Sequence, residues 1–256
     1  MKKLLLILIA IVTLAACNTD KKSFFETGNI TINGKIENFS KNDSITSIPF
    51  YSKDFLSFEL YQTNETKIDA SGNFSISFKI PNKQVLFFYY KNSAKLYVEP
   101  NQTINLTFDG KLKDKKSFLK SIKISGPLAK ANNLLIKYHI NDPIDYNKYY
   151  ESYRSKKTPN GMYNFVDSVY NNKRIYIDNF IKNNDVPNDL INWLTIEKEI
   201  KPITELLQYA VFHFRSNNKE KTLEESLGEK YIKKLNKLPL IKQEHFVNSE
   251  IYTILP

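Results

Sequence analysis

The chain has 256 residues, a formal net charge of +10 and a single cysteine, Cys17. One cysteine excludes an intramolecular disulfide, a Cys-x-x-Cys redox pair and a thiolate metal cluster. Lysine carries nearly all of the positive charge, and the only arginines are Arg154, Arg174 and Arg215, whereas nucleic-acid readers favour the arginine fork. We therefore expect no nucleic-acid partner, and the length indicates about two domains.

The N-terminal residues have the pattern of a secretory signal. Lys2 and Lys3 precede an apolar run that continues to Leu14, small residues follow, and polar residues begin at Asn18. A positive start, an apolar middle and a small-residue end are the three regions of a cleaved signal peptide. A membrane-spanning helix needs about 20 predominantly apolar residues, and this segment stops short of that length. The prediction is a signal over residues 1–16 and a polar tether over residues 17–27.

The stretch Leu14-Ala15-Ala16-Cys17 resembles the lipobox of bacterial lipoproteins. The resemblance implies cleavage before Cys17 and its acylation with fatty acids such as palmitate, which would make Cys17 a lipidation site. Two or three acyl chains hold a protein durably on a membrane, whereas one chain does so only marginally. Asn18 is not the aspartate that retains lipoproteins at the inner membrane in some bacteria, so we expect an outer-membrane anchor facing the periplasm. The alternative is an ordinary signal peptide followed by an unrelated cysteine.

Residues 28–126 show the alternation of half-buried strands. In residues 74–80, apolar side chains alternate strictly with Ser75, Ser77 and Lys79, and Pro81 ends the strand. The predicted strands cover residues 30–36, 55–61, 74–80, 85–90, 95–98, 103–108 and 121–125, with a loop at 41–47. Because no helix is predicted between them, we expect an antiparallel β-sandwich.

Residues 127–256 have helical periodicity. The predicted helices begin at Pro127, cover 161–183 and 187–201, continue as an apolar stripe over 203–214, and resume at 222. Pro202 is expected to break or kink the helix that it follows. Thr222 and Glu225 have the spacing of a capping box, which predicts the start of a helix that carries Tyr231. The fold class expected is α+β, with an N-terminal antiparallel β-sandwich followed by an all-helical C-terminal region.

Four stretches of the chain resemble the N-terminal part of a family of Gram-negative envelope lipoproteins. They are Gly34-Lys35-Ile36-Glu37-Asn38, Asp69-Ala70-Ser71-Gly72-Asn73-Phe74, Tyr97-Val98-Glu99-Pro100-Asn101 and Ile124-Ser125-Gly126-Pro127-Leu128-Ala129-Lys130-Ala131-Asn132. The family consists of thioredoxin-like thiol-disulfide oxidoreductases that carry an extra domain of unknown function before the redox domain. The resemblance covers roughly residues 28–140 and implies a β-domain, a helical region and an envelope address.

The chain departs from that family at the redox site. The family uses Trp-Cys-x-x-Cys, but the only tryptophan here, Trp193, is followed by Leu194 and Thr195. No catalytic residue of the family can be carried over, which leaves two interpretations: a truncated or a stand-alone N-terminal part of such an oxidoreductase.

Other chemistry has little support in the sequence. His139, His213 and His245 are too far apart for a local metal motif, and the acidic pairs Glu197/Glu199 and Glu224/Glu225 are typical of solvated helix faces. The seven glycines are dispersed, so no phosphate-cradling loop is predicted. We expect no catalytic residue, no metal and no cofactor.

Aromatic residues gather in two places. Residues 87–90 are expected to fill the core and the sheet rim, and the tyrosines of residues 146–153 would follow one helical face. Such side chains could also bind sugars or a protein. Our first hypothesis is therefore a lipid-anchored, non-catalytic envelope protein that acts as an interaction or scaffold module for an envelope protein partner. The alternatives are the oxidoreductase fragment and a module that binds glycans or acidic polymers.

Overall fold

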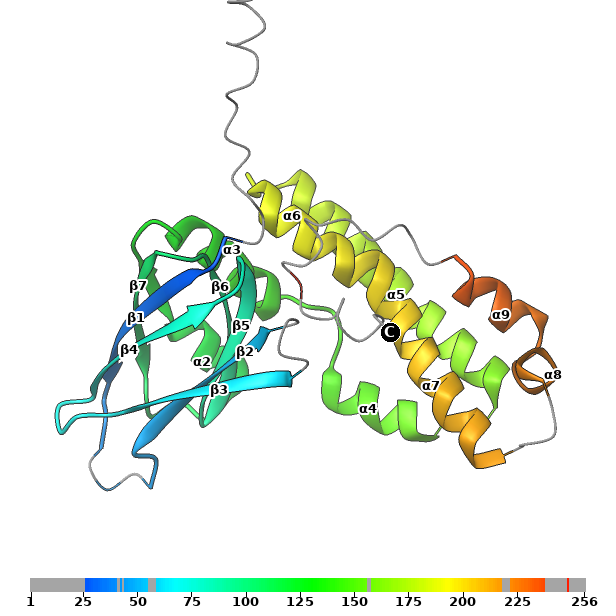
Figure 1. Ribbon diagram of the computed structural model, residues 1–256, viewed down its shortest axis with the longest axis horizontal. Helices are drawn as coiled ribbons and strands as arrows, with labels where there is room; N and C mark the ends of the chain where they lie inside the picture. Colours follow the sequence, from blue (N-terminus) through cyan, green and yellow to red (C-terminus); the bar gives the residue numbers. More distant parts are fainter. Residues whose placement is uncertain are drawn as a thin grey trace, which may run out of the picture.

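The computed structural model describes residues 26–40, 42, 44–54, 59–155, 158–217, 222–237 and 248, and it has two four-stranded sheets with helices beside them (Figure 1). One sheet has the order β4-β1-β7-β8, formed by Asn73–Ile80, Gly28–Glu37, Thr103–Asp109 and Lys123–Ser125. The other has the order β3-β2-β5-β6, formed by Glu59–Lys67, Ser47–Asp54, Gln84–Tyr90 and Asn92–Val98. The predicted signal, with Cys17, lies outside the described residues.

Aromatic side chains from the two sheets share one core. Phe50 of β2 lies 6.3 Å from Phe74 of β4 between ring centroids, and Phe88 of β5 lies 5.6 Å from Phe108 of β7. Each of these rings is at least 95 % buried. Burying a side chain of this size stabilises the fold by about 1.5–3 kcal/mol, so this cluster holds the two sheets together.

The sheets differ from the expected arrangement in three ways. β1 pairs with β7 in parallel, in register from Thr31↔Thr103 to Glu37↔Asp109, so the strands are not all antiparallel. Alternation identifies a strand but not the direction of its neighbour, which depends on the long connection between the two strands. β2 was not predicted, and the predicted strand 55–61 is replaced by β3, with residues 55–58 outside the described part.

A helix, α2 (Lys115–Ser121), also lies between β7 and β8, where none was expected. Asp114 caps it by accepting a hydrogen bond from the Ser117 backbone N–H at 2.8 Å, and Phe118 and Leu119 are its buried residues. Two adjacent apolar residues give too little periodicity to show a helix of this length. β8 is consequently shorter than the predicted strand 121–125.

The helices that follow are α3 (Ala129–Ile140), α4 (Tyr146–Ser155), α5 (Pro159–Lys182), α6 (Asn188–Thr195), η1 (Ile196–Ile200), α7 (Lys201–Asn217), α8 (Leu223–Leu227) and α9 (Glu229–Leu235). The helices predicted from Pro127 and over 161–183 are confirmed as α3 and α5. The fold is therefore of the α+β class. None of the described helices is both long and apolar enough to cross a membrane.

α3 is fixed to the edge strand β6 by one asparagine. The Asn132 side chain accepts a hydrogen bond from the Tyr97 N–H at 2.8 Å and donates to the Tyr97 carbonyl at 2.9 Å. The backbone N–H and C=O groups of an edge strand need hydrogen-bond partners. The Asn132 side chain provides one for each of these groups of Tyr97, as a neighbouring strand would.

Pro202 does not break the helices around it. The preceding residues form the π-helical turn η1, in which the Lys201 N–H bonds to the Ile196 carbonyl, and α7 continues directly from it. Proline has no N–H to donate, and a widened turn accommodates that loss. The stripe expected on α7 is only partly buried, because Leu207 is 36 % and Val211 41 % exposed, while the side chain of Phe214 lies outside the described part.

The capping box at Thr222 is confirmed, but the helix after it is short. The Thr222 N–H donates to Glu225 Oε2 at 2.8 Å, and the Glu225 N–H donates to Thr222 Oγ1 at 3.2 Å. Gly228, with a φ of 83°, then separates α8 from α9, because this backbone conformation cannot continue a helix.

The hydrophobic interior consists of two clusters that meet along α5. Ile177 and Phe180 belong to the cluster that contains the sheets, α2, α3 and α6. Met162, Val166 and Tyr170 belong to the cluster formed with α4, α7, α8 and α9. Lys173 lies on the same stripe of α5, between these two sets, and its side chain is only 1 % exposed. A buried charge therefore stands where the two hydrophobic clusters meet.

Candidate functional site

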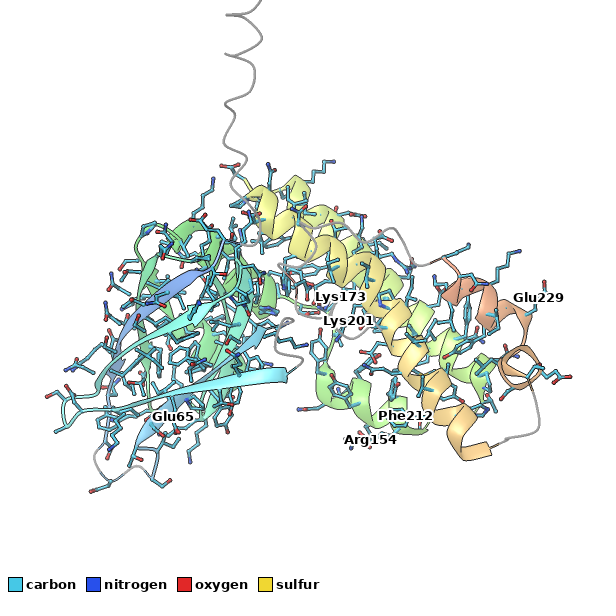
Figure 2. The ribbon with its side chains drawn as sticks, in the orientation of Figure 1. Glu65, Arg154, Lys173, Lys201, Phe212 and Glu229 are labelled. Carbon is cyan, nitrogen blue, oxygen red and sulfur yellow. The ribbon has the colours of Figure 1, made fainter. Side chains whose placement is uncertain are left out.

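Lys173, labelled in Figure 2, is the centre of a buried polar cluster. Its ammonium group lies 3.1 Å from Asp142 Oδ2 and 3.3 Å from Glu197 Oε2, and it donates to the Tyr146 hydroxyl at 2.7 Å. The Asp142 and Glu197 side chains are 5 % and 4 % exposed. Asn248 donates from its Nδ2 to Glu197 Oε1 at 3.3 Å and to the Trp193 carbonyl at 3.2 Å. A buried charge is tolerated only when paired in this way.

Lys173 and Glu197 stay charged near neutral pH. Burial opposes the charge on Lys173, but the carboxylates of Glu197 and Asp142 outweigh it and raise the pKa of the ammonium group above its usual value. Burial likewise opposes the charge on Glu197, but Lys173, Lys95 and Lys201 hold the pKa of that carboxyl well below its usual range. Burial also raises the pKa of Tyr146, whose hydroxyl keeps its proton and donates to Asp142 at 3.2 Å.

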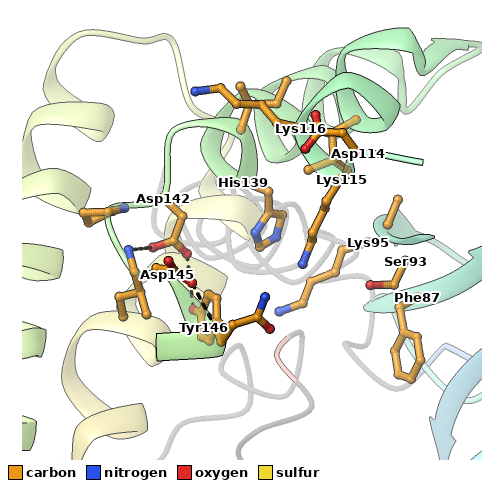
Figure 3. Close-up of a pocket in the computed structure, with 16 residues that line it drawn as sticks. Phe87, Ser93, Lys95, Asp114, Lys115, Lys116, His139, Asp142, Asp145 and Tyr146 are labelled. Atoms are coloured by element: carbon orange, nitrogen blue, oxygen red, sulfur yellow. Dashed lines mark hydrogen bonds between the residues drawn. The ribbon is translucent and has the colours of Figure 1, made fainter. Parts of the chain in front are cut away.

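A pocket of about 690 Å³ opens beside this cluster (Figure 3). One wall comes from β5 and β6, through Phe87, Ser93 and Lys95. A second wall comes from the start of α2, and a third from the chain between His139 of α3 and Asn147 of α4. A volume between about 300 and 1,000 Å³ is typical of sites for small molecules.

The polar groups of the pocket come from all three walls. In Figure 3 the side chains of Lys95 and Lys115 extend into the space in front of the His139 ring. The Lys95 ammonium group also lies 4.9 Å from the centroid of the Trp193 ring, and the His139 ring lies 5.7 Å from the same tryptophan. Burial lowers the pKa of His139 well below its usual range, and the ammonium groups of Lys95, Lys173 and Lys115 add to this effect. His139 is therefore a neutral imidazole.

The prediction that Glu197 and Glu199 both lie on a solvated helix face is wrong for Glu197. Glu197 is buried and bound to Lys173, whereas a solvated helix face was expected. Periodicity could not reveal this, because its partner Lys173 lies on another helix. Glu199 is 45 % exposed and lies 3.4 Å from Lys198. Glu225 is exposed and caps α8, as its spacing predicted, and the side chain of Glu224 lies outside the described part.

The histidines do not gather into one site. His139 lines the pocket, His213 stacks on Tyr209 of α7 at 5.3 Å between ring centroids, and His245 lies outside the described residues. Among the described residues, no three His, Cys, Asp or Glu side chains form a group that could hold a metal ion. Cys17, the predicted lipidation site, is also outside this range.

The two aromatic stretches have different environments. Phe88 and Tyr90 are fully buried, Tyr89 is 49 % exposed, and Phe87 stacks on Tyr51 at 4.7 Å between ring centroids. Residues 146–153 are helical, in α4. Of its tyrosines, Tyr149 is buried and Tyr150 is 46 % exposed. Most of these rings therefore pack against protein.

Comparison with protein-family models, with curated proteins and with solved structures gives no match to this chain. The resemblance to the N-terminal part of the envelope oxidoreductases stays a prediction.

Proposed function

We propose that this protein is a lipid-anchored envelope lipoprotein whose folded part is a non-catalytic interaction module. The observation that carries the proposal is Cys17 at the end of an apolar N-terminal run, behind Leu14, Ala15 and Ala16. β1 begins at Gly28, so residues 17–27 lie between the anchor and the first strand. The pocket between the sheets and helices offers a place for a partner group to bind.

We also propose that the strands form a β-sandwich domain over 28–126, followed by a helical region over 127–256. The shared aromatic cluster of the two sheets supports this arrangement. In the structure, each of the four stretches that resemble the envelope oxidoreductases contains a residue with positive φ: Asn38, Gly72, Asn101 and Gly126. Few residues other than glycine and asparagine adopt this conformation readily. These four residues thus have a role in chain geometry.

The anchor is tested by replacing Cys17 with alanine in cells supplied with labelled palmitate. We expect the natural chain to carry the label and to sediment with membranes, and Cys17→Ala to lose both properties, because the acylated sulfur would be missing. Thr19→Ala is the matched control and keeps both. If Cys17→Ala stays in the membrane fraction and the natural chain carries no label, the proposal is wrong.

The oxidoreductase fragment is the second candidate, and the sequence resemblance of the four stretches favours it. Sequencing the gene beyond the codon for Pro256 separates the two candidates. A downstream Trp-Cys-x-x-Cys codon run, in frame or in a shifted frame, would support the fragment. Unrelated sequence would contradict it.

A further inference from the structure

The pocket beside Lys173 combines apolar walls with cationic groups. Phe87, Leu119, Ile140 and Pro143 supply apolar surface, and Lys95, Lys115 and Lys116 supply ammonium groups. Three carboxylates, those of Asp114, Asp142 and Asp145, also line the pocket. How strongly they repel a bound anion depends on the groups to which they are already hydrogen-bonded.

Each of these carboxylates already serves the protein's own structure. Asp114 caps α2 through the Ser117 N–H. Asp142 accepts from Lys173 at 3.1 Å and from the Ile144 N–H, also at 3.1 Å. Asp145 accepts from the Asn147 N–H at 3.2 Å at the start of α4 and lies 3.6 Å from Lys148. Each carboxylate is therefore already hydrogen-bonded within the protein, and Asp142 and Asp145 each also lie beside a lysine.

The ammonium group of Lys115 is differently placed. It makes no ion pair or hydrogen bond with any residue in the described part of the chain, and it extends toward Lys95 and His139 (Figure 3). Two neighbouring lysines attract an anion, because each added positive charge raises the local potential.

His139 provides the third polar group. Its Nε2 atom is buried and has no hydrogen-bond partner among the described residues. Buried polar atoms of this kind are uncommon in folded proteins, and a missing ligand atom is one explanation. An oxygen of a bound anion would satisfy Nε2 once the side chains that close this atom off from solvent move aside.

We propose that this pocket binds a small organic anion, with its carboxylate or phosphate at Lys95, Lys115 and His139 and its apolar body against Phe87 and Leu119. This inference rests on the proposed function, because it names the chemistry that the interaction module recognises. The volume of about 690 Å³ accommodates a ligand of one or two rings.

Trp193 makes the binding measurable. It is the only tryptophan in the chain, and Lys95 lies over its ring. The experiment titrates the full chain, solubilised in detergent, with benzoate, phenyl phosphate and the neutral benzamide, and follows tryptophan fluorescence and heat. We expect saturable binding of at least one anion and at least about tenfold weaker binding of benzamide, since a charge-assisted hydrogen bond contributes more than a neutral one. Preference between benzoate and phenyl phosphate identifies the anionic group.

Variants locate the binding. We expect Lys115→Ala and Lys95→Met each to weaken anion binding about tenfold, in line with the loss of one charged partner. Methionine is an apolar side chain of similar length, so Lys95→Met removes the charge while keeping most of the side-chain volume. Lys120→Ala removes an equal charge from the far end of α2, and Lys79→Ala does so from β4, and neither should change the affinity.

Two results would overturn the inference: no saturable binding of either anion, or equal affinities in Lys115→Ala and Lys120→Ala. Each of these results can be distinguished from a failure of the lipid-anchor proposal. A chain that binds benzoate but carries no palmitate would contradict the lipid anchor alone. A chain that carries palmitate and binds neither anion would contradict the pocket alone.

Discussion

Lys173 is the residue on which the interior charge balance depends. Its two carboxylate partners come from separate segments, Asp142 before α4 and Glu197 in η1. Removing one member of a buried ion pair leaves the other charge without compensation, which costs more than the pair contributes when intact.

We therefore expect Lys173→Met to lower the free energy of unfolding by about 3–5 kcal/mol, because Glu197 and Asp142 would remain buried without a cation. Denaturant unfolding measures this. The control is Lys198→Met, which removes a lysine 25 % exposed and 3.0 Å from Asp178. Exposed pairs contribute about 0–1 kcal/mol, so equal losses in the two variants would contradict the role of Lys173.

The same cluster predicts how stability depends on acid. The pKa of Glu197 is lowered in the folded chain, so the unfolded chain takes up this proton first as the pH falls. Glu197 thus stabilises the fold fully above its unfolded pKa, about 4.3, and this contribution is lost progressively below it. Lys173 has a raised pKa, so its contribution is complete below the unfolded lysine pKa and is lost only in strong alkali.

We expect Glu197→Gln to flatten the fall of unfolding free energy with decreasing pH below about 4.3, because the titrating group is gone. Denaturant titrations at several acid pH values measure this slope. Glu199→Gln is the matched control, two residues away and 45 % exposed, and should keep the natural slope. Identical slopes in the two variants would show that Glu197 is not the group responsible.

At the scale of elements, the alternation of apolar and polar residues was enough to locate most strands. It could not give the parallel pairing of β1 with β7, nor α2, whose buried face is only Phe118 and Leu119. Helical periodicity with Leu128, Ala131 and Leu135 places Asn132, and not Asn133, on the buried face of α3. Periodicity could not show that the Asn132 side chain bonds to the backbone of β6, because that strand is distant along the chain.

Those two asparagines give a matched test of how α3 is attached. We expect Asn132→Ala to lower the free energy of unfolding by about 2–3 kcal/mol, because the N–H and carbonyl of Tyr97 would lose their partners on a buried edge. Asn133 is exposed, and Asn133→Ala should change stability by less than about 0.5 kcal/mol. Thermal unfolding of both variants measures the difference. Similar midpoint temperatures for Asn132→Ala and Asn133→Ala would contradict the role of Asn132.

At the scale of the whole molecule, the candidate site was the part least accessible from sequence. His139 was recognised as a lone histidine, but its neighbours Lys95 and Lys115 come from β6 and α2, far away along the chain. Lysines are common in this composition, and nothing in their spacing distinguishes these two. The pocket exists only after the sheets and helices have assembled.

The position of Lys173 between two hydrophobic clusters also restricts how the halves of the molecule can be arranged. Apolar side chains tolerate sliding against one another, but a one-turn shift of α5 would move Lys173 by about 5.4 Å. Its contacts to Asp142 and Glu197 span 3.1 and 3.3 Å, so such a shift would break both. The ion pairs thus set the axial register of α5 relative to Asp142, a residue that also lines the pocket.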